Sequence, residues 1–325
     1  MDSEAIARAV AILRAGGLVA FPTETVYGLG ADASNPEAVQ KIYAAKERPR
    51  EHPLIVHVAD VTQVKEWTRE FADTAERLGQ RYWPGPLTLI LKRAAHVSDL
   101  VTGGQDTVAL RVPSHPVARA LLKGFGSGVA APSANRYGRV SATTAQHVRS
   151  EFGDAVECVL DGGASDVGIE STIVDLSGGQ PALLRPGSVT RQQLEETLGQ
   201  PLAAAGAASP RAPGMLAAHY APQTPLMLME ADLVLELAAS MTRQGHKVAV
   251  LARSVVQSLI PGVTWMAAPR DPAGYAHELY ASLRTLDQAG CSAILVEQPP
   301  PEPVWVAIHD RLMRAAAGSA TPDAT

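Results

Sequence analysis

Two short segments of the sequence carry side chains that can bind a polyanion. The first is Lys46-Glu47-Arg48-Pro49, the second is Pro132-Ser133-Ala134-Asn135, and each is expected to follow an apolar strand. Guanidinium and ammonium groups make charge-assisted hydrogen bonds to phosphate oxygens, and each such bond contributes about 1.5–3 kcal/mol where water is excluded. If both segments open onto one cleft, their cations, hydroxyl and amide predict a site for a nucleoside triphosphate.

Each segment also has a plainer interpretation. The basic residues around Lys46 are typical of a solvated loop, although Pro49 restricts the backbone of Arg48 and thereby favours an aimed side chain. Ser133 and Asn135 alternate, so both project to one side if the segment is extended. A serine or asparagine turn explains the same pair equally well.

Other polar side chains stand at or near the ends of apolar runs. Thr23 and Thr25 come directly after a buried strand, where open α/β sheets place their ligands, although a polar turn is the plainer interpretation. Arg111 ends another strand and either reaches solvent or binds a carboxylate in bidentate fashion. His57 lies within an apolar strand, which leaves open a satisfied core histidine and a histidine that binds a ligand.

Several catalytic signatures are absent from the sequence. It has no G-x-x-x-x-G-K-[ST] phosphate loop, no H-E-x-x-H zinc motif and no G-x-S-x-G nucleophile elbow. Gly28-Leu29-Gly30 is not a dinucleotide fingerprint, because Ala33 stands where the third glycine is needed. Cys158 and Cys291 have no C-x-x-C partner, so we expect neither a disulfide framework nor a thiolate metal site.

The composition is that of a globular protein. The 325 residues are 46% hydrophobic and 19% charged, and this length favours two domains. A formal net charge of −5 argues against an obligate nucleic-acid binder, which normally has a basic surplus. No apolar stretch approaches the roughly 20 residues that span a bilayer, and the acidic N-terminus does not resemble a signal peptide. We therefore expect a soluble cytoplasmic protein.

The order of apolar runs predicts an α/β sheet domain over residues 1–200. Helical spacing and caps indicate helices, and short apolar runs indicate strands between them. The expected helices cover about 4–15, 35–45, 71–78, 117–122 and 190–198, and the expected strands cover 18–21, 54–58, 87–91, 108–112, 129–131, 156–160, 172–176 and 182–184.

The chain changes character after residue 200. Residues 201–225 begin as an alanine-rich linker, but His219 and Tyr220 are too specific for a tether, so we expect a structured linker that closes over the cleft as a lid. Residues 226–317 alternate helices and strands, which predicts a small doubly wound domain. Residues 318–325 are expected to be disordered.

Taken together and in order, these pieces resemble the YrdC-like family of threonylcarbamoyl-AMP synthases, in its long two-domain form. The resemblance covers nearly the whole chain and is strongest over residues 18–222. The matching segments are Phe21–Gly30, Lys46–Pro49, Pro53–Val58, Trp83–Thr88, Ala109–Pro113, Pro132–Asn135, Gly168–Leu176, Leu184–Gly187, Ala212–Met215 and His219–Pro222. The fold it implies is α/β, with a twisted mixed-sheet YrdC-like catalytic domain, a structured linker and a small Rossmann-like C-terminal domain.

The resemblance implies a reaction in which L-threonine, bicarbonate and ATP give threonylcarbamoyl-AMP and pyrophosphate. The product would pass to the machinery that transfers the threonylcarbamoyl group to position 37 of certain tRNAs, and direct contact with tRNA is allowed but not required. Mg²⁺ would be carried mainly by the nucleotide, without a dedicated protein site. Such a reaction needs alignment and charge neutralisation more than covalent help from the protein.

The resemblance also implies roles for individual residues. Catalysis would depend on Lys46, Arg48, Ser133 and Asn135. ATP would contact Lys46, Arg48, His52, Thr107, Ser133, Ser141, Arg185, His219 and Tyr220, and L-threonine would contact Thr25, His57, Arg111, Ala131 (through its backbone) and Ser171. His52 stands where the family pattern has asparagine, and Val304–Ile308 replaces a glycine-rich stretch.

A second hypothesis is an RNA-binding module that uses the same basic cleft. The negative net charge and an aromatic content of 5% disfavour it, because stacking on bases needs exposed rings.

Overall fold

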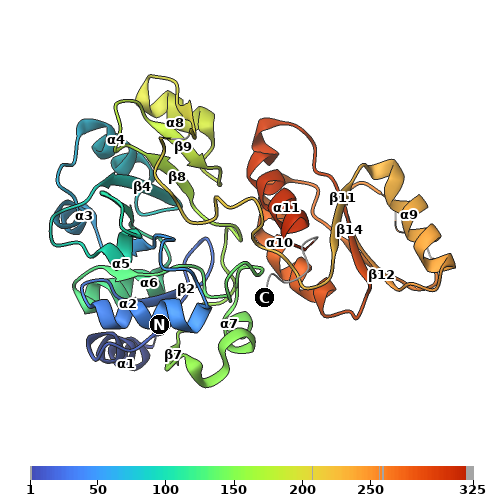
Figure 1. Ribbon diagram of the computed structural model, residues 1–325, viewed down its shortest axis with the longest axis horizontal. Helices are drawn as coiled ribbons and strands as arrows, with labels where there is room; N and C mark the ends of the chain where they lie inside the picture. The colour runs from blue at the N-terminus through green and yellow to red at the C-terminus, as the bar shows by residue number, and fades with distance from the viewer. Residues whose placement is uncertain (1, 207, 256, 258–259, 320–325) are drawn as a thin grey trace. The chain divides into compact units, whose positions relative to one another are not determined.

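The computed structural model describes residues 2–206, 208–255, 257 and 260–319 (Figure 1). Contacts between residues divide the chain into two compact units. The first unit contains the residues up to Tyr137 together with Ala142–Met215, and the second contains Gly138–Ser141 together with the residues from Leu216 onwards. None of the described helices is long and apolar enough to cross a membrane.

A ten-stranded mixed sheet forms the centre of the first unit, with the order β10-β9-β8-β4-β5-β3-β6-β2-β1-β7. Apolar side chains that the strands share with the surrounding helices form its main core. Its strands are β1 (Val19–Phe21), β2 (Gly28–Asp32), β3 (Ile55–His57), β4 (Leu87–Lys92), β5 (Thr107–Arg111), β6 (Val129–Ala130), β7 (Cys158–Val159), β8 (Thr172–Asp175), β9 (Ala182–Arg185) and β10 (Ala203–Ala204).

Short, well-capped helices surround this sheet. Asn35 caps α2 and Pro36 begins it, while Thr190 and Gln193 form the predicted capping box of α8. The helices α4 and α8 lie side by side (Figure 1). The helices are α1 (Ser3–Arg14), α2 (Pro36–Lys46), α3 (Val61–Trp67), α4 (Asp73–Tyr82), α5 (Asp99–Thr102), α6 (Pro116–Phe125), α7 (Ala145–Phe152) and α8 (Arg191–Leu198).

Strand register places the polar ends of β3 and β5 next to each other. β3 runs parallel to β5, with His57 opposite Arg111, and β6 runs antiparallel to β3, with Val129 opposite His57. The segment that follows β6 therefore runs back along β3, and Ala131 donates its N–H to the carbonyl of Ile55 (2.9 Å). Residues distant in sequence thus meet across the centre of the sheet.

Two local expectations were wrong. The segment that begins at Lys46 follows a helix rather than a strand, because Lys46 is the last residue of α2 and Glu47 ends the helix in the left-handed region at φ 55°. The polar-turn interpretation of the segment after Phe21 does not hold for Gly28–Asp32, which is the strand β2 and pairs with β1. A Cβ atom on Gly30 would lie 2.8 Å from the ring of Phe21, so glycine here permits close packing rather than a turn.

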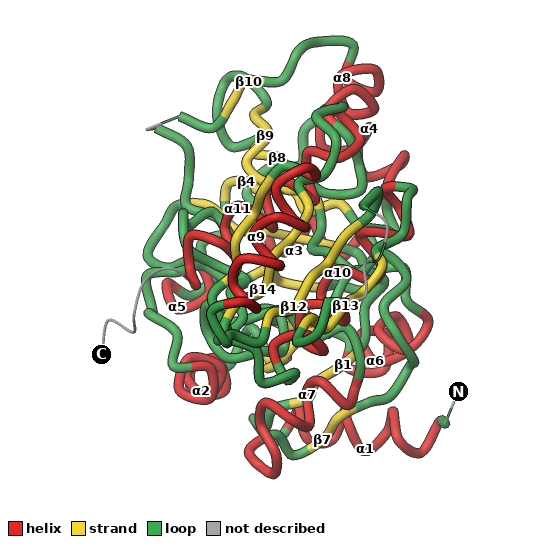
Figure 2. The backbone as a smooth tube through the Cα atoms, turned by 90° about the vertical axis from the view of Figure 1, so that its right-hand side faces the viewer, coloured by secondary structure: helices red, strands yellow, loops and turns green. Residues whose placement is uncertain are grey.

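The second unit contains a four-stranded parallel sheet with the order β11-β14-β12-β13, which confirms the doubly wound prediction. The helix α9 lies on one face, and α10 and α11 lie on the other (Figure 1), while Figure 2 shows the strands side by side. The elements are β11 (Leu226–Met229), α9 (Ala231–Arg243), β12 (Val248–Ala252), β13 (Val263–Ala267), α10 (Pro272–Asp287), β14 (Ala293–Glu297) and α11 (Val306–Ser319).

The end of the chain differs from its expectation. Residues 318 and 319, expected to be disordered, form the last turn of α11. The remainder of the expected tail, 320–325, lies outside the described residues.

The expected linker, 201–225, has two structured parts. Ala212 is buried among Ile55, Ile90 and Ala109 in the first unit, and Arg211 donates to the carbonyl of Gly103 (2.7 Å). His219–Pro222 belongs to the second unit. The sequence therefore divides between the two cores near Met215, inside the expected linker.

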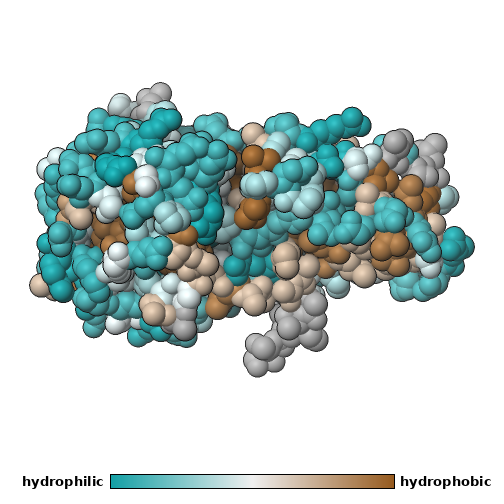
Figure 3. All heavy atoms as spheres, turned by 90° about the horizontal axis from the view of Figure 1, so that it is seen from above, coloured by the Kyte–Doolittle hydropathy of each residue, from teal (hydrophilic) through white to brown (hydrophobic). Residues whose placement is uncertain are grey.

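The second unit carries the large apolar side chains that are exposed among the described residues. Figure 3 shows a mainly hydrophilic face on which apolar patches cover part of this unit. The large apolar side chains that are exposed in the described residues all belong to it, namely Leu216, Met227, Leu233, Val304, Val306 and Met313.

Candidate functional site

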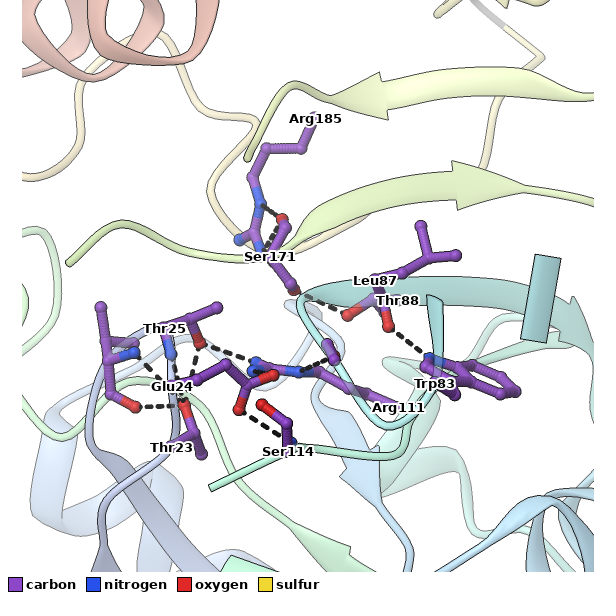
Figure 4. Close-up of polar contacts among 12 residues, drawn as sticks. Thr23, Glu24, Thr25, Trp83, Leu87, Thr88, Arg111, Ser114, Ser171 and Arg185 are labelled. Atoms are coloured by element: carbon purple, nitrogen blue, oxygen red, sulfur yellow. Dashed lines mark hydrogen bonds and ion pairs between the residues drawn. The ribbon is translucent and has the colours of Figure 1, made fainter. Parts of the chain in front are cut away.

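Arg111, at the end of β5, is held by acceptors from two segments of the first unit, the turn that contains Gly85 and the segment that contains Glu24 and Thr25. Its Nε donates to the carbonyl of Gly85 (3.2 Å), its Nη1 donates to Oγ1 of Thr25 (2.8 Å), and its Nη2 pairs with Oε1 of Glu24 (2.8 Å) (Figure 4). The residue is only 3% exposed. Of the two interpretations that the sequence left open, an arginine that simply reaches solvent is therefore excluded.

Glu24 is a site residue that the sequence reasoning missed. Burial by itself would raise the pKa of Glu24, but the charge and hydrogen bonds of Arg111 outweigh burial and lower the pKa of this carboxyl. Its Oε2 accepts the backbone N–H of Ser114 (3.0 Å). The available signal was an acid between Thr23 and Thr25, directly after a buried strand, where an unpartnered carboxylate would be costly.

The turn Trp83–Pro86 holds the other side of Arg111. Gly85 offers its carbonyl to Arg111 and donates its N–H to the carbonyl of Val112 (2.8 Å). Trp83 closes the turn by donating Nε1 to the carbonyl of Leu87 (2.7 Å) (Figure 4). A Cβ atom on Gly85 would lie 2.3 Å from the carbonyl oxygen of Tyr82. The turn is therefore compact enough only for glycine at this position.

Ser171 and Arg185 form a second buried group beside this network. The Oγ of Ser171 shares a hydrogen bond with Oγ1 of Thr88 (2.7 Å), and Arg185 donates to the carbonyl of Ser171 through Nε (3.0 Å) and Nη2 (2.9 Å) (Figure 4). Nη1 of Arg185 donates to the carbonyl of Pro213 (2.9 Å). Ser171, which was expected to contact threonine, is thus in direct contact with Arg185, which was expected to contact ATP.

His57 is buried and uncharged. Its ring packs edge-on against Phe21 (centroids 5.9 Å apart), and its Nδ1 has no hydrogen-bond partner among the described residues. Burial, and then the nearby charge of Arg111, lower the pKa of His57 to about 3. A neutral imidazole with a free nitrogen can donate to or accept from a ligand. A fully satisfied core histidine, the plainer interpretation, does not describe this side chain.

Lys46 joins the two segments from which the triphosphate site was predicted. Its Nζ donates to the carbonyl of Ser133 (2.7 Å) and to the carbonyl of Asn135. The side chain is 1% exposed. Burial, and then the charge of Arg48, hold the pKa of Lys46 well below its usual range. The neutral amine has two donors, which these carbonyls use, and the charged form has a third that a bound anion would favour.

Arg48 and His52 lie close to the same segments. Nη2 of Arg48 donates to the carbonyl of Pro53 (3.0 Å), and the guanidinium lies over the ring of Tyr137, 5.7 Å from its centroid. The hydroxyl of Tyr137 shares a hydrogen bond with Nε2 of His52 (3.3 Å). Burial, and then Arg48, lower the pKa of His52, which favours its neutral form. The solvated-loop interpretation does not hold for Lys46 or for Arg48, which is 8% exposed.

The segment after β6 is tied to β2 as far as Ser133 and then bends, with the N–H of Asn135 donating to the carbonyl of Ser133 (3.0 Å). Leu29 donates its N–H to the carbonyl of Pro132 (2.9 Å), and Ala134 donates its N–H to the carbonyl of Tyr27 (2.7 Å). Gly28 and Ser133 form an isolated antiparallel bridge. This pairing fixes the direction in which the carbonyls of the segment face Lys46.

The expected ligands divide between the two ends of parallel strands. Arg48 contacts Pro53, just before β3, and Thr107 begins β5, whereas His57 and Arg111 end these two strands. At about 3.3 Å per residue, Thr107 and Arg111 lie about 13 Å apart. The structure therefore does not bring Thr107 to Arg111. It separates one group of side chains expected to bind ATP from the group expected to bind threonine.

Three further expected residues belong to the second unit. The carbonyl of Ser141 accepts a hydrogen bond from Nε of Arg284 (3.2 Å). Tyr220 is 1% exposed, stacks on Tyr280 (centroids 5.8 Å apart) and has the guanidinium of Arg311 over its ring, while His219 packs against Tyr220 (4.2 Å). Both aromatic residues are therefore well packed in their own unit.

The chemistry available in the first unit is binding and alignment. Its cations and hydroxyls suit phosphate and carboxylate oxygens. The described residues contain no group of three or more His, Cys, Asp or Glu that could hold a metal ion.

Comparison with known proteins agrees with this arrangement. A family model described as "Telomere recombination", which covers Sua5, YciO and YrdC proteins, matches residues 11–187, and a model described as "Threonylcarbamoyl-AMP synthase, C-terminal domain" matches residues 189–317. The threonylcarbamoyl-AMP synthase of Bacillus subtilis is 40% identical over 322 residues, which are 96% of this chain and 93% of the relative.

An archaeal relative supports the same assignment. The threonylcarbamoyl-AMP synthase of Pyrococcus abyssi is 37% identical over 95% of this chain and 93% of its own length. The crystal structure of P. abyssi Sua5 complexed with L-threonine superposes with a TM-score of 0.90 at 36% identity, covering 97% of this chain and 94% of that chain. The chain therefore belongs to the threonylcarbamoyl-AMP synthase family, in the form that has both domains.

Proposed function

We propose that this protein is an enzyme that makes threonylcarbamoyl-AMP from L-threonine, bicarbonate and ATP. The amine of threonine takes up the carbon of bicarbonate, with loss of water, to form a carbamate. A carbamate oxygen then attacks the α-phosphorus of ATP, and pyrophosphate leaves. The names of relatives that match nearly the whole chain support this reaction.

The group at the ends of β3 and β5 is proposed to bind threonine. Arg111 has five N–H donors, three of which are used within the chain, so two remain for the carboxylate. Neutral His57 offers its free Nδ1 to the substrate. Thr25, Ser171 and the backbone of Ala131 complete the proposed contacts.

The group around Lys46 is proposed to bind ATP. The remaining donor of Lys46 and the guanidinium of Arg48 neutralise phosphate charge, and Ser133 supplies a hydroxyl. Asn135 lies on the same segment and helps to shape the reaction centre. His52, Thr107, Ser141, Arg185, His219 and Tyr220 remain further proposed contacts for the nucleotide.

Mg²⁺ is proposed to arrive with the nucleotide. The side chains proposed for the phosphates are mainly cations and hydroxyls, which suit phosphate oxygens better than a metal ion. When bound, Mg²⁺ would neutralise charge on the phosphates, while the protein orients the reactants.

The single observation that supports this proposal most is the pair of hydrogen bonds from Lys46 to the carbonyls of Ser133 and Asn135. They bring together two segments that are far apart in sequence and whose polar groups suit a triphosphate. A surface that only binds anions would not require a second buried group of residues. The residues proposed to bind threonine form such a group at the other end of the same strands.

Pyrophosphate release tests the proposal. The purified protein should release pyrophosphate from ATP only when both L-threonine and bicarbonate are present, and mass spectrometry should detect the adenylate. Release that needs neither threonine nor bicarbonate would reject it.

Use of the product in tRNA modification and a cytoplasmic location are part of the same proposal. A threonylcarbamoyl-adenylate is an activated acyl donor, so its consumer must be an acyl-transfer enzyme. Addition of that enzyme and unmodified tRNA to the reaction should give threonylcarbamoylated tRNA.

A further inference from the structure

We propose that Glu24 makes the threonine site selective for zwitterionic amino acids over carboxylates that lack an ammonium group. This inference rests on the proposed function, because it assumes that Arg111 binds the carboxylate of threonine. It concerns a residue to which neither the sequence analysis nor the proposed contacts with substrate assign a role.

The charge of Arg111 is compensated before any substrate binds. Oε1 of Glu24 lies 2.8 Å from Nη2 of Arg111, and the two side chains are 6% and 4% exposed. A lone buried guanidinium would attract any small carboxylate. Paired with Glu24, the same guanidinium offers hydrogen-bond donors with little net positive charge.

Glu24 has capacity to bind a second cation. Its two carboxylate oxygens can accept about four hydrogen bonds. Within the chain they receive Nη2 of Arg111 and the N–H of Ser114. The neighbouring residue, Thr25, contacts Arg111 directly, so a carboxylate on Arg111 lies close to Glu24 as well.

These contacts predict opposite effects on two classes of ligand. A carboxylate without an ammonium group brings a second negative charge next to Glu24, and like charges placed together in a buried site disfavour binding. An α-amino acid brings its own positive charge, which Glu24 attracts. Arg111 attracts the carboxylate of either class of ligand. Glu24 disfavours simple carboxylates by repulsion and thereby supplies the selectivity.

The wild-type protein provides the first test, by calorimetric titration with L-threonine and with 3-hydroxybutanoate, which is threonine without its ammonium group. We expect 3-hydroxybutanoate to bind at least about 100-fold more weakly, as sites with buried polar groups reject analogues that lack the matching group. Binding of the two ligands within threefold of each other would overturn the inference. Failure of threonine itself to bind would instead remove the proposed function.

The variant Glu24→Gln provides the second test, because it removes the charge and keeps the shape. We expect weaker binding of threonine and stronger binding of 3-hydroxybutanoate, so that their ratio falls at least about tenfold. If Glu24 only supports the structure, both ligands will weaken alike, which would overturn the inference. Asp175→Asn is the matched control, since Asp175 is also a buried acid that accepts a backbone N–H, from Ser177 (2.8 Å), and its ratio should not change.

If a thermal melt shows that Glu24→Gln does not fold, the wild-type titrations decide whether the inference holds. Those titrations need no variant and support or overturn the inference by themselves.

Discussion

At the scale of single residues, Lys46 connects the two segments on which the proposed ATP site depends. Its ammonium is buried, yet its partners in the first unit are carbonyl oxygens rather than a carboxylate. Burial and the charge of Arg48 disfavour the charged form of Lys46, and the negative charge of a bound phosphate would favour that form.

Replacement of Lys46 by methionine should lower kcat/KM for ATP by about 100-fold or more, the usual effect of removing one aligned donor in a closed site. Lys41→Met is the matched control, because Nζ of Lys41 also donates to a carbonyl, that of Gly16 (2.6 Å), but outside the site. Steady-state kinetics with ATP as the varied substrate measure both variants. Equal losses in the two variants would contradict the role assigned to Lys46.

His57 predicts a pH dependence of stability. Its pKa is about 3 in the folded protein against an ordinary 6.5, so below pH 6.5 the unfolded chain takes up a proton that the folded chain does not. Stability is therefore lost as the pH falls from 6.5, by about 2 kcal/mol between pH 7 and pH 5 from this residue. The lowered pKa of Glu24 changes stability mainly below pH 4.5, the ordinary pKa of this carboxyl. The effect of His57 between pH 7 and pH 5 can therefore be measured separately.

Urea unfolding of the first unit at pH 7 and pH 5 measures this effect. The loss of unfolding free energy should be smaller in His57→Gln than in the wild type by about the same 2 kcal/mol. Identical losses in the two proteins would show that His57 is not held neutral.

At the scale of elements, sequence patterns predicted most strands and many helices of the first unit, because buried apolar runs and caps are local signals. The patterns failed where local and tertiary preferences conflict. Gly28 and Gly30 look like a turn but form a strand that packs closely on Phe21. The helices α3, α5 and α7 were not predicted, since each is short and carries few apolar positions.

The site was predicted less completely than the elements. Lys46, Arg48 and Ser133 could be selected from residue type and spacing. The pairing of Glu24 with Arg111 joins the segment between β1 and β2 to the end of β5, and the bond from Arg111 to Thr25 spans 86 residues of sequence. No local pattern encodes such a contact. The separation of Thr107 from Arg111 likewise follows from strand direction.

The compact turn that contains Gly85 should not tolerate a side chain. Gly85→Ala places a Cβ atom against the carbonyl of Tyr82, so we expect destabilisation of about 1–3 kcal/mol and weaker binding of threonine, because the turn also holds Arg111. Gly178→Ala is the control, since nothing lies within 4 Å of the added atom. Urea unfolding and threonine titration measure the two effects, and unchanged threonine binding in a destabilised Gly85→Ala protein would contradict the link to Arg111.

At the scale of the whole molecule, the division into units does not follow the sequence order. Gly138–Ser141 belongs to the second unit although the residues on both sides belong to the first. Ala221 donates its N–H to the carbonyl of Gly138 (2.8 Å), and Arg284 donates to the carbonyls of Val140 and Ser141. Sequence patterns place boundaries only between consecutive segments, so they could not predict this exchange.

Arg284 should therefore hold the backbone of Gly138–Ser141 in a fixed conformation. In Arg284→Ala we expect amide hydrogen exchange in this segment to become about tenfold faster, which corresponds to about 1.4 kcal/mol of local stability. Arg243→Ala, at the end of α9 and exposed, is the control and should not change the exchange rate. Exchange mass spectrometry of the peptide that covers residues 138–141 measures both, and an unchanged rate in Arg284→Ala would contradict this role.

The central claim is that the group around Lys46 and the group around Arg111 serve one reaction that joins threonine, a one-carbon unit and AMP. Incorporation of carbon-14 from labelled bicarbonate tests it most directly. The account predicts that the label appears in one compound that also contains threonine and AMP, and that it appears only when ATP and L-threonine are both present. Absence of label from any adenylate, while the protein still binds ATP and threonine, would contradict it.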